Sequence, residues 1–302
     1  MEALQIPVMS VSEPIASSSA EHEDLADILD ISLPALFSIA PIAFSTPTPT
    51  SFHTYLPPPP HTPIQLRLPN PSAEVYSKLQ ANHLWLSALY LADLIHLQKI
   101  QVQGQIIAEL GAGAGLPSLS ACRLGAKVVA SDWGDRGILE ALEDNFTRTC
   151  PAGGWAVRGH EWGTDPTPLL DALDLVGLRT GPHEDDDLAS RLDPKHNRFD
   201  KLFLADTLWV TEAHSALLDS VWNLLKPGGI AHIAAGLHTG RGPLWRFIEM
   251  AEKRGGTVMN QKEVLWKAED EWEEGAVSSS SGLEDCLFTH LRAHETREDL
   301  VC

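Results

Sequence analysis

The feature that most constrains this chain is a glycine-rich turn between two apolar segments. Residues 105–110 have the pattern of a buried strand, residues 111–115 read Gly-Ala-Gly-Ala-Gly, and residues 116–124 have helical spacing. Glycines in such a turn let the backbone approach a ligand closely, and the following helix offers free amide groups to negative atoms. The sequence therefore predicts a strand, a turn and a helix that together border a ligand site.

Strand and helix patterns alternate on both sides of this turn. Further strands are expected at residues 127–132, 155–159, 199–206 and 230–237, and helices at residues 72–97, 137–146, 168–175, 212–225 and 243–254. Such alternation is typical of an α/β fold with a parallel sheet and helices on both faces. Strand patterns at residues 257–265 and 286–294 predict a C-terminal antiparallel hairpin. The acidic and serine-rich residues 269–281 between them predict a solvated insertion.

The first part of the chain differs from the rest in composition. Residues 1 to about 70 are rich in Ser, Thr and Pro, with four consecutive prolines at 57–60, and lack a long amphipathic period. Such a composition cannot build a packed core. We expect residues 1–61 to form a largely disordered arm and residues 62–302 to form the domain. Residues 31–39 are apolar enough to dock on it, and residues 64–68 alternate like a strand.

Charge and cysteine content exclude several classes of function. With 41 acidic and 22 basic residues, the formal net charge is −19, which would repel both a nucleic-acid backbone and an anionic membrane surface. The four cysteines form no C-x-x-C pair, and the histidines do not have the spacing of a three-ligand zinc site, so no metal is expected. Because no signal peptide or membrane span of ~20 apolar residues is recognisable, we expect a cytoplasmic protein, acting as a monomer.

Two carboxylates accompany the glycine turn. Asp132 ends the next strand about twenty residues on, where a carboxylate holds ribose hydroxyls in nucleotide-binding sheets, although it could instead cap the following helix. Glu109 directly precedes the turn, where it would repel a pyrophosphate but attract an ammonium or a sulfonium. Leu116 stands where the dinucleotide fingerprint G-x-G-x-x-G has its third glycine. The pattern favours S-adenosylmethionine over a dinucleotide.

The residues around the turn resemble a known family. Residues 109–119, Glu-Leu-Gly-Ala-Gly-Ala-Gly-Leu-Pro-Ser-Leu, are similar to the first motif of the seven-β-strand methyltransferases. The similar branch contains protein-lysine methyltransferases and fungal proteins described as nicotinamide N-methyltransferase-like or elongation-factor methyltransferases. Further motifs of that branch resemble His83-Leu84-Trp85, Glu161-Trp162-Gly163 and Leu204-Ala205-Asp206. The resemblance spans about residues 64–294 and implies a Rossmann-like, seven-stranded methyltransferase sheet.

The resemblance also implies which residues bind S-adenosyl-L-methionine. Together with Glu109, the candidate cofactor-binding residues are Trp85, Gly111, Ala112, Gly113, Asp132, Trp162 and Ala205. In this arrangement the glycines would pass under the methionine part, Asp132 would hold the ribose and Trp162 would border the adenine. Trp85 and Trp162 could equally be core residues, since tryptophans are mostly buried.

Two departures from the family pattern leave the substrate open. Residues 132–135 read Asp-Trp-Gly-Asp where related fungal sequences usually have Asp-Tyr-Pro-Asp, and residues 207–209 read Thr-Leu-Trp where an asparagine-histidine or tyrosine pattern is commoner. Trp133, Asp206 and Trp209 are the candidates for orienting a substrate, because an apolar rim with a polar anchor favours a neutral amine. Asp206 could instead only close its strand. No residue is assigned a catalytic role beyond this.

Three functions are open at this point. The first is an enzyme that methylates an amine of a basic protein, such as a lysine or the N-terminus of a translation factor, as the resemblance implies. The second is a small-molecule N-methyltransferase, nicotinamide-like or tailoring a natural product. The third is a cofactor-binding module without catalysis. We expect an amine acceptor, because no histidine is positioned as a strong base for an oxygen acid.

Overall fold

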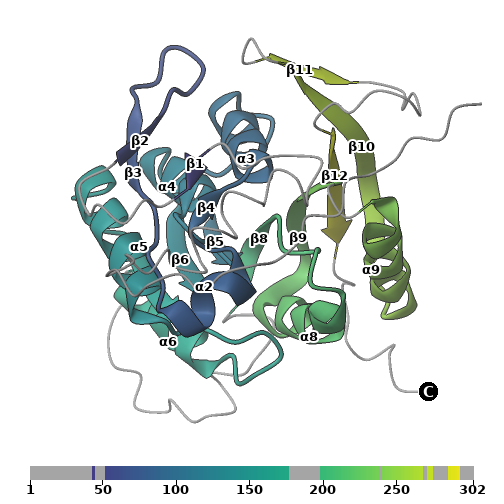
Figure 1. The fold of residues 1–302 in the computed structure, drawn as a ribbon. Helices are drawn as coiled ribbons and strands as arrows, with labels where there is room; N and C mark the ends of the chain where they lie inside the picture. Colours follow the sequence, from purple (N-terminus) through teal and green to yellow (C-terminus); the bar gives the residue numbers. More distant parts are fainter. Residues whose placement is uncertain are drawn as a thin grey trace, which may run out of the picture.

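The computed structural model describes residues 43–44, 52–176, 198–237, 240–267, 271–274 and 285–292. Its centre is an eight-stranded sheet with the order β11-β10-β12-β9-β8-β5-β6-β7 (Figure 1). The parallel strands are β5 (Ile106–Leu110), β6 (Lys127–Asp132), β7 (Trp155–Gly159), β8 (Phe199–Ala205) and β9 (Leu225–Gly236). The expected Rossmann-like α/β sheet is confirmed.

The antiparallel end of the sheet is built from the C-terminal part of the chain. β12 (Asp285–Arg292) lies between β9 and β10 (Thr257–Lys267) and is antiparallel to both. The expected hairpin is therefore confirmed. β11 (Glu271–Glu274) pairs with the end of β10, so part of the insertion expected at residues 269–281 adds an eighth strand to the seven that the sequence predicts.

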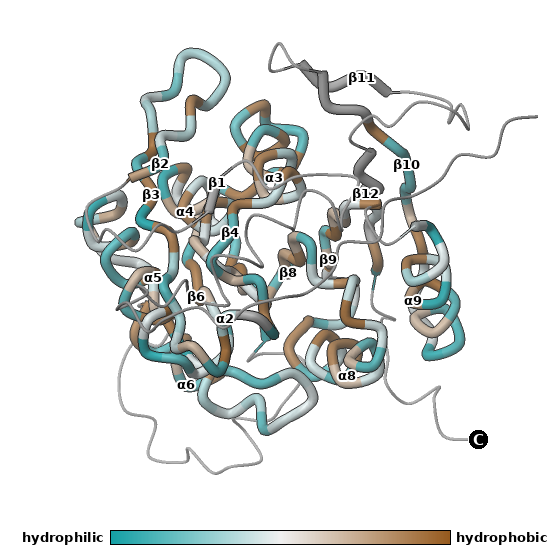
Figure 2. The backbone as a smooth tube through the Cα atoms, viewed as in Figure 1, coloured by the Kyte–Doolittle hydropathy of each residue, from teal (hydrophilic) through white to brown (hydrophobic). Residues whose placement is uncertain are grey.

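Helices cover both faces of the sheet because alternate residues of each strand point to opposite sides. One apolar cluster joins Ile107 and Phe203 to α3 (Leu86–His96), α4 (Leu116–Arg123) and α5 (Arg136–Thr149). The other joins Ala108 and Leu204 to α6 (Thr167–Leu175), α8 (His214–Leu224) and α9 (Arg241–Lys253); the short 3-10 helix η1 (Thr211–Ala213) precedes α8. Figure 2 shows hydrophobic residues concentrated on the central strands between these layers. No helix in the described ranges is both long and apolar enough to cross a membrane.

The single long helix expected over residues 72–97 is wrong. The chain forms α2 (Ala73–Leu79), then β4 (His83–Leu84), then α3. Gln80 ends α2 in the left-handed conformation with φ of 53°, and β4 pairs antiparallel with β1 (Ala43–Phe44). Apolar residues on both sides of the break pack against the same core cluster, so the helical period continues across the interruption and conceals it.

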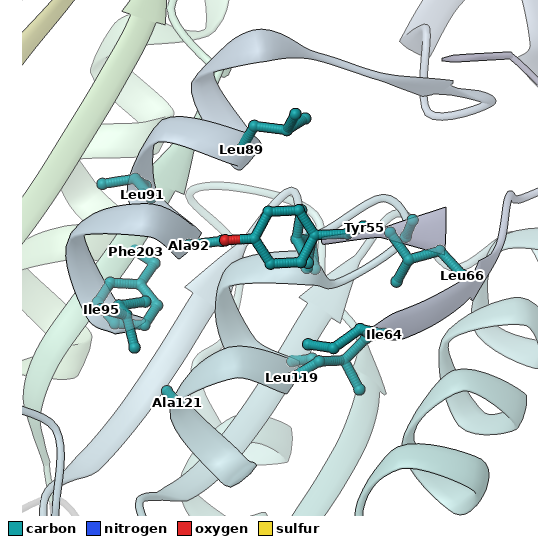
Figure 3. Packing of buried hydrophobic residues seen from close by; sticks show 14 of the residues in the cluster. Tyr55, Ile64, Leu66, Leu89, Leu91, Ala92, Ile95, Leu119, Ala121 and Phe203 are labelled. Carbon is teal, nitrogen blue, oxygen red and sulfur yellow. The ribbon is translucent and has the colours of Figure 1, made fainter. Parts of the chain in front are cut away.

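The boundary expected at residue 61 falls inside a folded hairpin and is corrected by it. β2 (Phe52–Tyr55) pairs antiparallel with β3 (Ile64–Arg67). Tyr55 is only 4% exposed, and its hydroxyl donates a hydrogen bond of 2.5 Å to Asp93 Oδ1 on α3. Figure 3 shows the Tyr55 ring between the hairpin and α3. Residues 52–55 therefore belong to the folded unit, whereas residues 31–39, expected to dock on it, lie outside the described residues.

Candidate functional site

A cavity of about 330 Å³ lies at the carboxyl ends of the parallel strands, the edge at which open α/β sheets bind their ligands. Its lining comes from the turn after β5, the end of β6, the loops after β7 and β8, and the segment from α2 to α3. Ten residues expected at the site line it: Trp85, Gly111, Ala112, Gly113, Asp132, Trp133, Trp162, Ala205, Asp206 and Trp209. The structure therefore brings together residues that lie more than a hundred positions apart.

The glycine turn has no room for side chains at its first position. Gly111 has a φ of 70°, and a Cβ atom there would lie 2.9 Å from Thr207 Cγ2 and 3.1 Å from Trp162 Cζ2. Gly113 has a φ of 53°, also in the left-handed region that favours glycine. The turn, the loop after β7 and the loop after β8 therefore meet at Gly111.

Asp132 is held in one orientation by backbone amides. Its Oδ2 accepts a hydrogen bond from the Gly113 amide at 2.7 Å, and its Oδ1 accepts one from the Trp133 amide at 2.7 Å. Burial raises the pKa of Asp132 to about 6, against the opposing effect of these two amides. Asp132 does not cap the following helix, because Asp135 does so by accepting a hydrogen bond from the Gly137 amide at 2.8 Å. This removes the structural alternative that the sequence leaves open for Asp132.

Glu109, which the sequence predicts to contact the cofactor, is not among the residues that line the cavity. Glu109 is completely buried. Its Oε2 accepts a hydrogen bond from the Ser118 amide at 3.0 Å, in the first turn of α4, where Gly115 has no side chain to act as the cap. Burial raises the pKa of Glu109 to about 8, partly offset by this bond. Glu109 therefore supports the turn from behind.

Ser220 on α8 connects that helix to the loop after β7 by hydrogen bonding. Ser220 Oγ accepts a hydrogen bond from the Gly163 amide at 2.8 Å and lies 3.0 Å from His160 Nε2. Trp162 lies between His160 and Gly163 in the sequence. It lines the cavity and also packs against the core cluster of α6, α8 and α9. Trp85, on the opposite segment, donates a hydrogen bond from Nε1 to the Gln80 carbonyl at 3.4 Å. Both tryptophans therefore combine packing with exposure to the cavity.

The loop after β8 is strained and anchored. Asp206 has a φ of 56°, uncommon for a residue with a side chain. Its amide donates a hydrogen bond to the Ala234 carbonyl at 2.8 Å, and its Oδ1 accepts one from the Gly236 amide at 3.1 Å. The carboxylate thus ties the ends of β8 and β9 together while it lines the cavity. Trp133, 40% exposed, and Trp209 supply apolar surface at the same cavity.

Comparison with known proteins places this chain in a family. No family model matches it. It is 35% identical over 159 residues to the protein N-terminal and lysine N-methyltransferase EFM7 of Gibberella zeae, covering 50% of this chain and 54% of that protein. The EFM7 protein of Eremothecium gossypii is 30% identical over 204 residues, covering 63% of this chain and 68% of that protein. The chain belongs to the EFM7 methyltransferase family.

The extent of the match is partial. The chain spans 54% and 64% of the length of the EFM7 proteins of Gibberella zeae and Neurospora crassa. Among solved structures, a TehB-like SAM-dependent methyltransferase of Corynebacterium glutamicum aligns over 74% of this chain and 95% of that chain, with 15% identity and a TM-score of 0.44. A structural similarity of this size carries no functional weight.

Part of the cavity lining of this EFM7-family chain escapes sequence reasoning. Besides Thr207 and the His83-Leu84-Trp85 motif, the lining includes Leu79, Gln80, Ala81, His160 and Val210. The segment from α2 to α3 was concealed by the uninterrupted helical period. Thr207 carried a signal, since it begins one of the two departures from the family pattern, but a departure does not by itself reveal a contact.

Proposed function

We propose that this protein is an S-adenosyl-L-methionine-dependent methyltransferase that methylates an amine of a protein, a lysine or an N-terminus. The observation that carries the proposal is the convergence of the glycine turn, Asp132 and Trp162 on one cavity at the ligand-binding edge of the sheet. Relatives named protein N-terminal and lysine N-methyltransferases support the acceptor class. A basic translation factor is one candidate for the acceptor protein.

The residues of the site fit this cofactor. The cavity has the size of small-molecule sites, about 300 Å³ or more. Because Gly111 has no side chain, Thr207 and Trp162 can pack against its backbone while the turn itself lines the cavity, where it can lie against the methionine part. Asp132 presents a fixed carboxylate for ribose hydroxyls, and Trp162 offers an aromatic surface for the adenine. When bound, the cofactor supplies an electrophilic methyl group on a sulfonium.

The residues of the chain would act on the amine mainly by orientation and desolvation. A protonated amine has no lone pair, and a lysine has a reference pKa of about 10.4. Apolar surface at Trp133 and Trp209 would exclude water and favour the neutral amine. Holding the nitrogen close to the methyl carbon would then supply most of the acceleration. We place the protein in the cytoplasm, where its thiols at Cys122 and Cys150, both free, fit a reducing environment.

The test is transfer of a labelled methyl group. The full chain is incubated with labelled cofactor and a fungal cell extract divided into protein and metabolite fractions, and the methylated atom is located by mass spectrometry. We expect label on a nitrogen in the protein fraction. Label in the metabolite fraction alone would replace the protein acceptor by a small molecule, and a methylated oxygen or carbon as the sole product would contradict the amine. Binding of S-adenosylhomocysteine without any transfer would indicate a binding module.

A further inference from the structure

Thr207 presents a hydroxyl group that the folded chain leaves unused. The residue is 4% exposed, and its Oγ1 atom is buried without a hydrogen-bond partner in the part of the chain that the structure describes. Buried polar groups are nearly always hydrogen-bonded, so such an exception calls for an explanation. Thr207 lines the cavity, where a bound molecule can supply the missing partner.

The side chain of Thr207 is fixed from two directions. Its Cγ2 methyl group lies 2.9 Å from the position that a Cβ atom of Gly111 would occupy, so the methyl group faces the glycine turn. The backbone before it is held by Asp206, whose amide and carboxylate both bond to the end of β9. A β-branched side chain has few rotamers. The side chain is therefore held in few conformations, and Trp209 and Val210 line the same cavity.

We propose that Thr207 Oγ1 accepts a hydrogen bond from an N–H of the neutral acceptor amine, an inference that rests on the proposed function. A neutral primary amine has two N–H donors and one lone pair, so donating one N–H to a hydroxyl leaves the lone pair free. A free carboxylate at this point would instead stabilise the ammonium form, which has no lone pair. Asp206 Oδ1 accepts a hydrogen bond from the Gly236 amide, which directs that oxygen towards β9 and leaves the Thr207 hydroxyl as a neutral acceptor at the cavity. Thr207 therefore orients the amine without stabilising its protonated form.

Two substitutions separate the hydroxyl from the methyl group. Thr207→Val keeps the shape and the methyl group facing Gly111 but removes the hydroxyl, whereas Thr207→Ser keeps the hydroxyl and removes the methyl group. Each full-length variant is compared with the unsubstituted chain by calorimetric binding of S-adenosylhomocysteine, by its melting temperature, and by the initial rate of labelled methyl incorporation into the extract's protein fraction.

We expect Thr207→Val to bind S-adenosylhomocysteine within about twofold of the unsubstituted chain and to lose about tenfold or more in transfer rate, the scale of one hydrogen bond. Thr207→Ser should keep at least about a third of the rate. The melting temperature of Thr207→Val should not fall, because the hydroxyl makes no hydrogen bond within the described residues that could be lost. An unchanged rate in Thr207→Val, or a tenfold loss of S-adenosylhomocysteine affinity, would overturn the inference. Absence of transfer by the unsubstituted chain would refute the proposed function itself, and this inference with it.

Discussion

The two sides of the cavity differ in how they are held. On the glycine-turn side, formed by residues 111–116 and Asp132, the buried carboxylate bonds to two backbone amides, and Glu109 supports the turn from behind. On the β8 side, formed by residues 205–210, the backbone is strained at Asp206 and the Thr207 hydroxyl has no partner among the described residues. Both sides keep buried polar atoms without a hydrogen-bond partner among the described residues, Glu109 Oε1 and Ser118 Oγ beside the turn and Thr207 Oγ1 on the β8 side, but of these three residues only Thr207 lines the cavity. This difference fits the proposal that the glycine-turn side holds the cofactor and the β8 side faces the acceptor.

The largest effect on cofactor affinity should come from a substitution of Gly111, on the glycine-turn side. Gly111→Ala places a Cβ atom 2.9 Å from Thr207 Cγ2 at a φ of 70°. Left-handed strain of ~1–2 kcal/mol and overpacking of ~1–3 kcal/mol should be relieved by displacement of the turn, Thr207 and Trp162, and we expect this displacement to lower S-adenosylhomocysteine affinity by about 100-fold or more. Gly104→Ala is the matched control, because Gly104 has the same φ of 70° with nothing within 4 Å. Equal affinities of the two variants in calorimetry would show that crowding at the turn does not matter.

Removing the carboxylate of the same side should have the next largest effect. Asp132→Ala should weaken S-adenosylhomocysteine binding by ~1.5–3 kcal/mol, the scale for hydrogen bonds to a charged group, which is about 10- to 150-fold. Asp135→Ala is the control, since Asp135 caps α5, and its loss should cost ~1 kcal/mol of stability without changing affinity. An unchanged dissociation constant for Asp132→Ala would assign that carboxylate a purely structural role.

The two sides also differed in how far the sequence could predict them. The strand bounds 127–132 and 155–159 are those of β6 and β7, because buried parallel strands give continuous apolar runs. The glycine turn and Asp132 were identified because their spacing is local. Whether Glu109 lines the cavity cannot be read from the sequence, because the direction of its side chain depends on the face of β5 from which it projects; in the structure it does not line the cavity. The helix break between α2 and α3 is not predicted by the sequence, although Trp85 within that segment is, because the break depends on pairing of β4 with the distant β1.

The pH dependence of S-adenosylhomocysteine binding should show a smaller effect of the Asp132 carboxylate on the glycine-turn side. Burial raises the pKa of Asp132 to about 6, and only the ionised carboxylate accepts hydrogen bonds from both ribose hydroxyls. Affinity for S-adenosylhomocysteine should therefore fall as the pH falls through about 6, by roughly tenfold between pH 7 and pH 5, following the fraction of ionised carboxylate. Asp132→Asn should remove most of this dependence. A profile that is the same in both proteins would mean that another group titrates.

The smallest effect on binding is expected at Glu109, which tests whether this residue supports the turn or contacts the ligand. Burial raises the pKa of Glu109 to about 8 from 4.5, so the folded chain holds this proton where the unfolded chain has lost it. Stability from this group is therefore greatest below about pH 4.5 and declines as the pH rises towards 8. Glu109→Gln keeps an oxygen acceptor for the Ser118 amide and cannot ionise.

The melting temperature of Glu109→Gln, relative to that of the unsubstituted chain, should therefore rise between pH 5 and pH 8. Its affinity for S-adenosylhomocysteine should stay within about twofold, because Glu109 is expected to make no contact with the ligand. The opposite pattern would be a difference in melting temperature that does not change with pH, together with a tenfold loss of affinity. That result would show that Glu109 contacts the ligand. It would also mean that the ligand supplies the partner of Glu109 Oε1, which is buried without a hydrogen-bond partner among the described residues. Because Glu109 lies behind the turn with its Oε2 engaged by α4, we expect the change to appear in stability alone.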